Sequence, residues 1–221
     1  MYSPYHQSIL RIPQTKIADL VQIVPEDFSK DASQAIEDNI NAKYANRVIQ
    51  KIGLCICLYD LLSASEGLIG HGTGLVNINV EFRLVVFRPF KHEVITGRIS
   101  SATENGIRIR TPFFDEIFVP ISKLPENSVF VPTGIDPHFT WKPDPTDPAS
   151  EDLHFDTHET VRVRIEEEIW TDQSPIGPRE KALEGGEAVK SHPYVLVGSM
   201  EDPGLGPCLW WDGDEEEEMG E

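Results

Sequence analysis

The sequence predicts an α+β chain in which a small β-α-β-β unit is followed by an all-β barrel. Three observations support this fold class. Apolar residues recur at every fourth position in one segment, as expected for a helix: Ile36, Ile40, Tyr44 and Val48. Strict alternation of apolar and polar residues marks a long strand after residue 75. Five short segments bounded by glycine or proline follow it, without room for crossover helices.

The first unit opens with a strand and one helix. Residues 1–14 contain Pro4 and Pro13 and are expected to form a flexible extension. Residues 15–24 are strand-like, and Pro25 ends that strand. Pro-Glu-Asp at 25–27 favours a helix start, because proline fits the first turn and acidic side chains favour the positive helix end. We therefore expect a helix that continues to a glycine stop at Gly53.

Two further strands complete the first unit. Residues 54–62 form one strand, and the four glycines of segment 63–74 indicate a turn or loop. Residues 75–90 form the other, with apolar Val76, Ile78, Val80 and Phe82 on one face. From Leu84 both faces are apolar, as expected where a strand enters an interface between domains. The domains are therefore assigned to residues 15–84 and 85–211.

The second unit is predicted to be a small closed barrel such as an OB fold. Its strands are expected at 92–102, 106–110, 113–120, 160–170 and 193–200. Gly97 lets a strongly bent first strand coil, and Gly106 makes the tight turn into the second. A polar, proline-rich stretch separates the third and fourth strands. Residues 171–192 lack periodicity and are expected to be a disordered loop, and residues 212–221 form an acidic tail.

The charge is unevenly distributed along the chain. A formal net charge of −18 argues against binding of duplex nucleic acid through a basic face and against docking on an anionic membrane. However, residues 1–140 hold 13 basic and 15 acidic side chains, whereas residues 141–221 hold 6 and 22. Residues 85–140, with 6 of each sign, are neutral. The total charge therefore does not exclude a low-affinity RNA contact on the barrel.

Composition also indicates the compartment. No apolar run approaches the roughly 18–20 residues of a membrane span. The first residues show no basic segment followed by an apolar one, so no signal peptide is expected. Three cysteines, Cys55, Cys57 and Cys208, give no disulfide framework. We expect an intracellular protein.

One face of the predicted barrel has the composition of a single-strand binding site. Arg108 and Arg110 share the polar face of the second strand, and Phe113 and Phe114 follow. Because neighbouring residues of a strand point to opposite faces, only one of these two rings can enter the core. OB folds stack bases on aromatic rings and contact phosphates with basic side chains. The candidate RNA contacts are Arg98, Arg108, Arg110, Phe113, Phe114 and Lys123.

Three other patterns were weighed as catalytic or metal sites. His154, Asp156 and His158 share one face if they lie on a strand, but no fourth ligand is apparent. The carboxylates of residues 166–168 alternate between faces and do not converge. Glycines 70, 72 and 74 precede a strand, so no helix N-terminus meets a phosphate there. No catalytic residue, cofactor or metal is predicted.

The block LVVFRPFKHEVITGRI at residues 84–99 carries a resemblance to a known family. It joins the first unit to the barrel through a Phe-Arg-Pro-Phe corner. In this it resembles the larger stalk protein of the multisubunit RNA polymerases, a family that has archaeal members and includes the eukaryotic seventh-largest subunits. KIADLVQIVPEDF near the start and GLGPCLWW at 204–211 are similar to the RNA polymerase III member. The resemblance spans Thr15 to Trp211.

The resemblance implies an RNP-like domain that docks on the polymerase core and an OB domain that faces emerging RNA. It also implies a heterodimer with a smaller stalk partner, a nuclear location, a role in initiation and no catalysis by this chain. Residues 1–14 and the tail after Trp211 exceed the usual length of the family. The candidate core or partner contacts are Lys43, Arg47, Phe87, Arg88, Pro89 and Phe90, together with the loop at 63–74.

Two alternatives stay open. A free OB-type factor of translation or RNA processing would bind single-stranded RNA tightly and in a salt-dependent way. A stalk subunit would bind RNA weakly when isolated, because the polymerase positions it. A metal-dependent enzyme would rest on His154, Asp156 and His158 and would contain stoichiometric metal.

Overall fold

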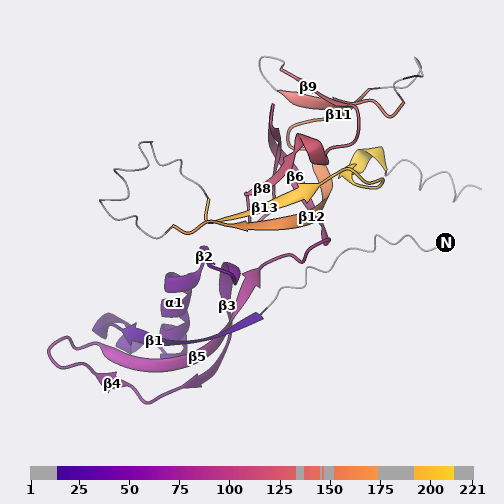
Figure 1. Cartoon of the computed structure of the whole chain (residues 1–221). Helices are drawn as coiled ribbons and strands as arrows, with labels where there is room; N and C mark the ends of the chain where they lie inside the picture. The colour runs from indigo at the N-terminus through magenta and orange to yellow at the C-terminus, as the bar shows by residue number, and fades with distance from the viewer. Residues whose placement is uncertain (1–13, 133–136, 145, 147–151, 174–191, 212–221) are drawn as a thin grey trace, which may run out of the picture. The chain divides into compact units, whose positions relative to one another are not determined.

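The computed structural model divides the chain into two compact units. It describes residues 14–132, 137–144, 146, 152–173 and 192–211. The units meet in sequence between Arg88 and Pro89, against an expected boundary after residue 84 (Figure 1). Most of the expected extension at 1–14, most of the loop at 171–192 and the whole tail at 212–221 lie outside the described residues. No helix of the described part is long and apolar enough to cross a bilayer.

The N-terminal unit is an antiparallel sheet with one helix packed against it. The sheet order is β1-β5-β3-β2, and β4 pairs with β5. The strands are β1 (Gln14–Ile23), β2 (Arg47–Ile49), β3 (Gly53–Ala64), β4 (Leu68–Ile69) and β5 (Val76–Phe87). Helix α1 (Ala32–Tyr44) buries Ala35, Ile36 and Ile40 in one core with the inward side chains of β5, such as Phe82 and Leu84. The predicted β-α-β-β order is confirmed, with β2 and β4 as short additions.

The helix is shorter than the spacing of apolar residues predicts. Residues Pro25–Ser29 form a separate 3-10 turn, η1. Helix α1 starts after Asp31, whose carboxylate accepts a hydrogen bond from the Ser33 backbone N–H at 3.1 Å. It ends at Tyr44 because Asn46 adopts a φ of 58°, a left-handed conformation that asparagine tolerates. The prediction of a helix as far as Gly53 is therefore wrong, and Val48 lies in β2.

The C-terminal unit is a closed five-stranded barrel. Its strands are β6 (Val94–Thr103), β7 (Gly106–Arg110), β8 (Ile117–Pro120), β12 (Thr160–Trp170) and β13 (Tyr194–Ser199). Around the barrel the order is β6-β7-β8-β13-β12, and β12 pairs with β6 to close it. Only the β8–β13 pair is parallel. This order is that of an OB fold, so the predicted α+β fold class is confirmed.

A small second sheet lies between the third and fourth barrel strands in sequence. It consists of β9 (Ser128–Val131), β10 (His138–Trp141) and β11 (Leu153–Phe155), in the order β11-β10-β9. The sequence did not predict it, because prolines interrupt the stretch and each strand is only three or four residues long. Phe139 and Phe155 are fully buried, and the Trp141 ring stacks on Trp210 with centroids 5.2 Å apart.

The GLGPCLWW segment therefore has a packing role. It contains β14 (Gly206–Pro207), which pairs with β12, and the 3-10 helix η3 (Cys208–Trp210). A further 3-10 helix, η2 (Ile121–Lys123), follows β8. Trp210 also packs edge-on against Phe155 at 4.7 Å between ring centroids. The end of the described chain is thereby fixed to the second sheet.

Close backbone approach between β6 and β7 depends on Gly97. A Cβ added at this position would lie 2.5 Å from Ile109 Cγ2 and 3.0 Å from the Arg110 carbonyl oxygen. Both distances are shorter than ordinary contacts, so a side chain here would push the two strands apart. The predicted bend at Gly97 is thus a region of very tight packing in the barrel wall.

We expect Gly97→Ala to lower the free energy of unfolding of the C-terminal unit by about 1–3 kcal/mol, as overpacking does in other cores. All four tryptophans of the chain lie after residue 140, so tryptophan fluorescence during urea unfolding reports on this unit alone. Ser100→Ala, an exposed position of the same strand, is the control and should change stability by less than about 0.5 kcal/mol. Equal stabilities of the two variants would contradict the account of Gly97.

Candidate nucleic-acid interface

The outer face of the barrel carries the arginines predicted from the sequence. Along β6 and β7 the isoleucines point inward and are buried, including Ile99, Ile107 and Ile109. The alternate positions point outward, so Arg98, Arg108 and Arg110 are exposed. This division follows directly from the two-residue period of a strand. The barrel wall therefore presents guanidinium groups on the side away from its core.

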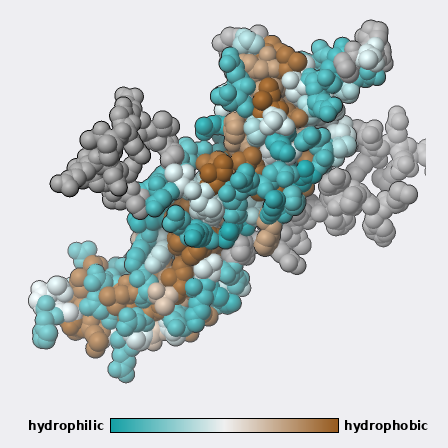
Figure 2. Space-filling model, viewed as in Figure 1, coloured by the Kyte–Doolittle hydropathy of each residue, from teal (hydrophilic) through white to brown (hydrophobic). Residues whose placement is uncertain are grey.

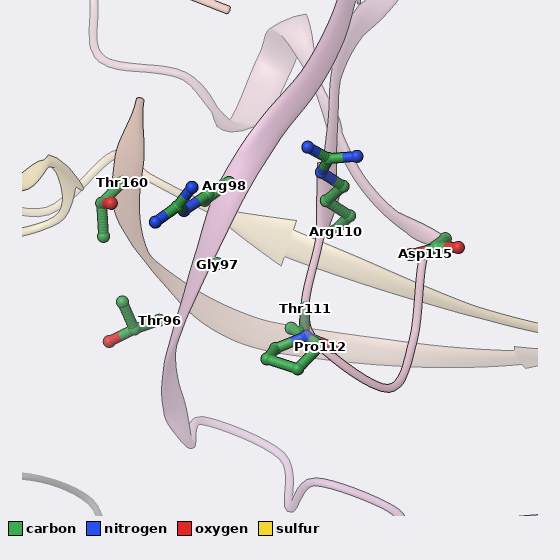
Figure 3. A pocket seen from close by; sticks show the side chains of 8 residues that line it. All are labelled: Thr96, Gly97, Arg98, Arg110, Thr111, Pro112, Asp115 and Thr160. Atoms are coloured by element: carbon green, nitrogen blue, oxygen red, sulfur yellow. The ribbon is translucent and has the colours of Figure 1, made fainter. Parts of the chain in front are cut away.

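Strand register brings two of these arginines together. Arg98 on β6 lies directly opposite Arg110 on β7, and its other neighbour is Thr160 on β12. A groove of about 510 Å³ runs between them (Figure 3). We call it the arginine groove. It is lined by Thr96, Gly97, Arg98, Arg110, Thr111, Pro112, Asp115 and Thr160.

The arginine groove brings two positively charged side chains to one surface. Within the described residues, neither Arg98 nor Arg110 makes an ion pair or a side-chain hydrogen bond. Like charges directly opposite each other on neighbouring strands destabilise a sheet. A phosphate between them would relieve that repulsion through charge-assisted hydrogen bonds. Asp115 is the one acidic residue among those that line the groove.

Arg108 and Lys123 lie outside the arginine groove. Arg108 points outward two residues before Arg110 on β7 and pairs with Glu116 at 3.3 Å. Lys123 belongs to η2 and does not line the groove. The hydrogen bond from Arg164 is the main cause that holds the pKa of Glu166 below its usual value, and the charge of Lys123 adds a smaller effect. Of the four predicted basic residues, the structure thus brings only Arg98 and Arg110 together.

The two adjacent phenylalanines differ in burial, but they lie before β8 and not on it, so the strand predicted from residue 113 is wrong at its start. Phe114 is 6% exposed and packs against Tyr194 with ring centroids 5.3 Å apart. Phe113 is 52% exposed and directly follows Pro112 of the groove lining. The prediction that only one of the pair enters the core is confirmed. Of the two rings, only Phe113 is available to stack on a base.

Strand β12 contributes residues that the sequence analysis did not select. Thr160 lines the arginine groove, and Arg162 lies directly opposite Thr96 of β6, on the same outer face. The alternation in TVRVRI was a sufficient signal for an outward Arg162. What the sequence could not supply was the pairing of β12 with β6, because these strands are far apart in the chain.

The predicted docking residues Lys43 and Arg47 differ in their contacts within the N-terminal unit. Lys43 forms an ion pair with Asp19 of β1, and the Tyr44 hydroxyl donates a hydrogen bond to the same carboxylate at 2.6 Å. Lys43 also lines a hollow of about 640 Å³ between β1 and α1, which includes Leu20 and Asn39. Arg47 on β2 is exposed and makes no ion pair with another described residue.

The Asp19 carboxylate and the Tyr44 phenol shift each other's pKa. Burial alone would raise the pKa of Asp19, but hydrogen bonds from Lys43 and Tyr44 outweigh it and hold that pKa below its usual value. Burial, followed by the hydrogen bond to Asp19, raises the pKa of Tyr44 to about 12. The site therefore links α1 to β1 through an ionised carboxylate and a protonated phenol.

The corner between the units has mixed exposure. Phe87 and Pro89 are buried, while Phe90 is exposed. The Arg88 guanidinium donates a hydrogen bond to the Lys51 carbonyl oxygen at 2.7 Å, within the N-terminal unit. Phe90 is held by its own turn, where its backbone N–H donates to the Glu93 carboxylate at 2.7 Å. Of these four predicted contact residues, Phe90 presents the most apolar surface.

The structure does not bring the His-Asp-His residues together as a metal site. Strand β11 ends at Phe155, so the shared strand face that would align His154 with Asp156 does not exist. His158 has a φ of 72° and lies in the turn before β12. Among the described residues, no group of three or more histidine, cysteine or acidic side chains is arranged to hold a metal ion.

Comparisons with known proteins cover nearly the whole chain. Residues 93–211 match the family model described as "RNA polymerase III subunit Rpc25". Residues 18–74 match "SHS2 domain found in N terminus of Rpb7p/Rpc25p/MJ0397".

Full-length relatives agree with these family models. The DNA-directed RNA polymerase III subunit rpc8 of Schizosaccharomyces pombe is 42% identical, over 89% of this chain and 98% of the relative. RPC8 of Saccharomyces cerevisiae is 38% identical, over 90% and 98%. The RNA polymerase II subunit RPB7 of Saccharomyces cerevisiae is 27% identical, over 66% of this chain and 81% of the relative.

We expect Asp19→Asn to lower the pKa of Tyr44 from about 12, without returning it fully to the unfolded value, because burial remains. In the native protein the protonated phenol contributes stability that is complete below about pH 10 and is lost as the pH rises through about 12. Ultraviolet difference titration of phenolate measures the pKa of Tyr44. The variant Tyr44→Phe identifies which part of the titration signal comes from Tyr44. As a control, Asp60→Asn removes a partner of Arg83 elsewhere in the sheet and should leave the pKa of Tyr44 unchanged. An unshifted Tyr44 in Asp19→Asn would contradict the linkage.

Proposed function

The chain belongs to the family of RNA polymerase III subunit Rpc25, which includes the RPC8 subunits, and from this membership we propose that it is a non-catalytic stalk subunit of the nuclear enzyme. In this role it forms a heterodimer with a smaller partner subunit, contributes to transcription initiation and contacts emerging RNA. The observation that carries the proposal is the extent of the match, which covers about nine tenths of the chain and nearly all of the Schizosaccharomyces pombe and Saccharomyces cerevisiae RPC8 relatives.

The arginine groove is the proposed RNA contact. Arg98 and Arg110 supply phosphate contacts, and the exposed Phe113 supplies a ring on which a base stacks. Two arginines in an electrically neutral region give a weak site, because each phosphate contact contributes only a modest salt-dependent term. The affinity of the chain for RNA therefore depends on positioning by the polymerase. Phe114 is not part of this contact, because its ring is buried.

The loop between β3 and β5 is the proposed docking element. It contains β4, where Leu68 and Ile69 are each 71% exposed, at the opposite end of β5 from Phe87. Figure 2 shows hydrophobic surface in the region where Figure 1 labels β4. Burial of each of these side chains against a partner would contribute about 1.5–3 kcal/mol at most. An apolar pair held at a loop tip is thus suited to a pocket on the polymerase core.

Lys43, Arg47 and Phe90 are proposed as further contacts with the core or the partner subunit. Arg47 and Phe90 are exposed, and Lys43 lines the hollow between β1 and α1. Phe87, Arg88 and Pro89 are less accessible, since Phe87 and Pro89 are buried and Arg88 donates to the Lys51 carbonyl. Catalysis is assigned to other subunits, in line with relatives that are named as subunits of RNA polymerase III.

Affinity purification of the full chain from cells tests the assignment. We expect RNA polymerase III subunits and one small partner subunit to be recovered with it. Leu68→Asp should reduce recovery of the polymerase core about tenfold or more, because it removes apolar surface and places a charge in the docking pocket. Gln34→Glu adds the same charge to an exposed position of helix α1, outside the proposed contacts, and should retain the core. Recovery of the chain as a stable monomer without polymerase subunits would overturn the proposal.

RNA binding by the purified full chain tests the groove. We expect weak binding of an unstructured oligouridylate, and the double variant Arg98→Gln, Arg110→Gln should weaken it about threefold to tenfold. The slope of log affinity against log salt should fall by roughly 1.4, since each lost phosphate contact removes about 0.7. Arg47→Gln with Lys91→Gln removes the same charge from exposed sites outside the groove. Equal effects of the two double variants would argue against the groove, and tight binding by wild type would favour a free RNA-binding factor.

A further inference from the structure

The arginine groove contains a carboxylate that has no partner in the described part of the chain. Asp115 is exposed and lines the groove together with Arg110. It makes no ion pair or side-chain hydrogen bond with another described residue, and in Figure 3 its side chain does not point toward Arg110. Because a carboxylate repels phosphate, contact with the RNA backbone alone does not account for an acidic residue at this position.

The turn that leads into Asp115 is closed by hydrogen bonds. The Thr111 backbone N–H donates to the Phe114 carbonyl oxygen at 2.7 Å, and the Phe114 N–H donates to the Thr111 hydroxyl at 3.0 Å. The Phe114 ring is buried against Tyr194. The backbone on the N-terminal side of Asp115 is thereby fixed to the barrel.

The residue after Asp115 is also engaged. The Glu116 carbonyl oxygen accepts a hydrogen bond from the Leu196 N–H at 3.0 Å. The Glu116 carboxylate lies 3.3 Å from Arg108 and 3.3 Å from His192. The neighbouring basic groups therefore pair with Glu116, while Asp115 keeps both of its carboxylate oxygens for a ligand.

Burial of Phe114 leaves the residues on both sides of it at the surface. Phe113 is 52% exposed, and Asp115 is exposed as well. The Cα atoms of two residues that are two positions apart lie at most about 7 Å from each other. A base that stacks on the Phe113 ring can therefore place its edge beside the Asp115 carboxylate.

The chemistry of a carboxylate distinguishes among the four RNA bases. An ionised carboxylate accepts hydrogen bonds and donates none. Guanine presents two neighbouring donors on its Watson–Crick edge, N1–H and the N2 amino group, which match the two oxygens of a carboxylate. Adenine and cytosine present one amino group beside an acceptor nitrogen, and uracil presents one N–H between two carbonyl oxygens. Guanine is thus the base that a carboxylate binds best.

We propose that Asp115 makes the arginine groove selective for guanine in single-stranded RNA. This inference deepens the proposed RNA contact and rests on it. The guanine ring stacks on Phe113 and donates N1–H and N2–H to the Asp115 carboxylate. Arg98 and Arg110 hold the flanking phosphates. Because phosphate contacts carry no sequence information, Asp115 is the specificity-determining residue of the groove.

The affinity of the full chain for two RNAs tests this selectivity. Both RNAs have about nine nucleotides, which is within the site size of an OB fold. One consists of uridine alone, and the other has guanosine at every third position. We expect fluorescence anisotropy to show about threefold to tenfold tighter binding of the RNA with guanosine. Inosine lacks the N2 amino group, so inosine in place of guanosine should remove most of this preference.

The variant Asp115→Asn should change the two affinities in opposite directions. Loss of the negative charge tightens binding of the uridine RNA, whereas loss of an acceptor oxygen weakens binding of the RNA with guanosine. The preference should then fall below about twofold. Glu104→Gln removes the same charge from an exposed position of the same unit, outside the groove, and should keep the preference. A preference that is absent from the native chain, or unchanged in Asp115→Asn, would overturn the selectivity.

The outcomes separate this inference from the proposed RNA contact. Binding that depends on Arg98 and Arg110 but is equal for the two RNAs would keep the RNA contact and reject selection of guanine. A guanosine preference that depends on Asp115 but survives Arg98→Gln with Arg110→Gln would keep the selection and reject the arginines as phosphate contacts. No measurable binding of either RNA would overturn both.

Discussion

The arrangement of the outer barrel face depends on the close approach of β6 and β7 at Gly97. Without a side chain there, the backbone of β7 lies against β6, and Ile109 fills the core beneath it. The same register places Arg98 opposite Arg110. Tight packing inside the barrel and repulsion between like charges outside it are therefore two results of one strand pairing. An anion bound between the two arginines would offset that repulsion.

The two units carry different kinds of interaction surface. In the N-terminal unit, Asp19 fixes α1 to β1 through Lys43 and Tyr44, and the sheet then presents apolar Leu68 and Ile69 at its far end. Apolar surface of this kind favours a permanent, well-packed contact with a protein. In the barrel, exposed guanidinium groups favour a reversible, salt-sensitive contact with an anionic chain. In the proposed function, anchorage and RNA contact therefore fall to separate units of the molecule.

Most of the fold could be predicted from the sequence, because alternation and glycine punctuation survive in the long strands. The helix end at Tyr44 could not, since the apolar spacing continues through Val48 and only the left-handed Asn46 reveals the break. The strands β9, β10 and β11 are too short and too rich in neighbouring prolines to show a period. At the site, alternation placed Arg110 on the polar face of its strand, but the position of Thr160 beside Arg98 depended on a pairing between distant strands. Lys123, selected from the sequence, lies on η2 outside the groove.

The single parallel contact of the barrel has a consequence for how the protein is made. Strand β13 joins β8 to β12, with Leu196 beside Ile117, so the barrel cannot close until its last strand is available. The sheet and helix of the N-terminal unit, in contrast, are complete by Phe87. During synthesis the N-terminal unit can therefore fold while the ribosome is still adding barrel strands. Long-range closure makes the barrel the slower unit to fold, and assembly can begin from the N-terminal end.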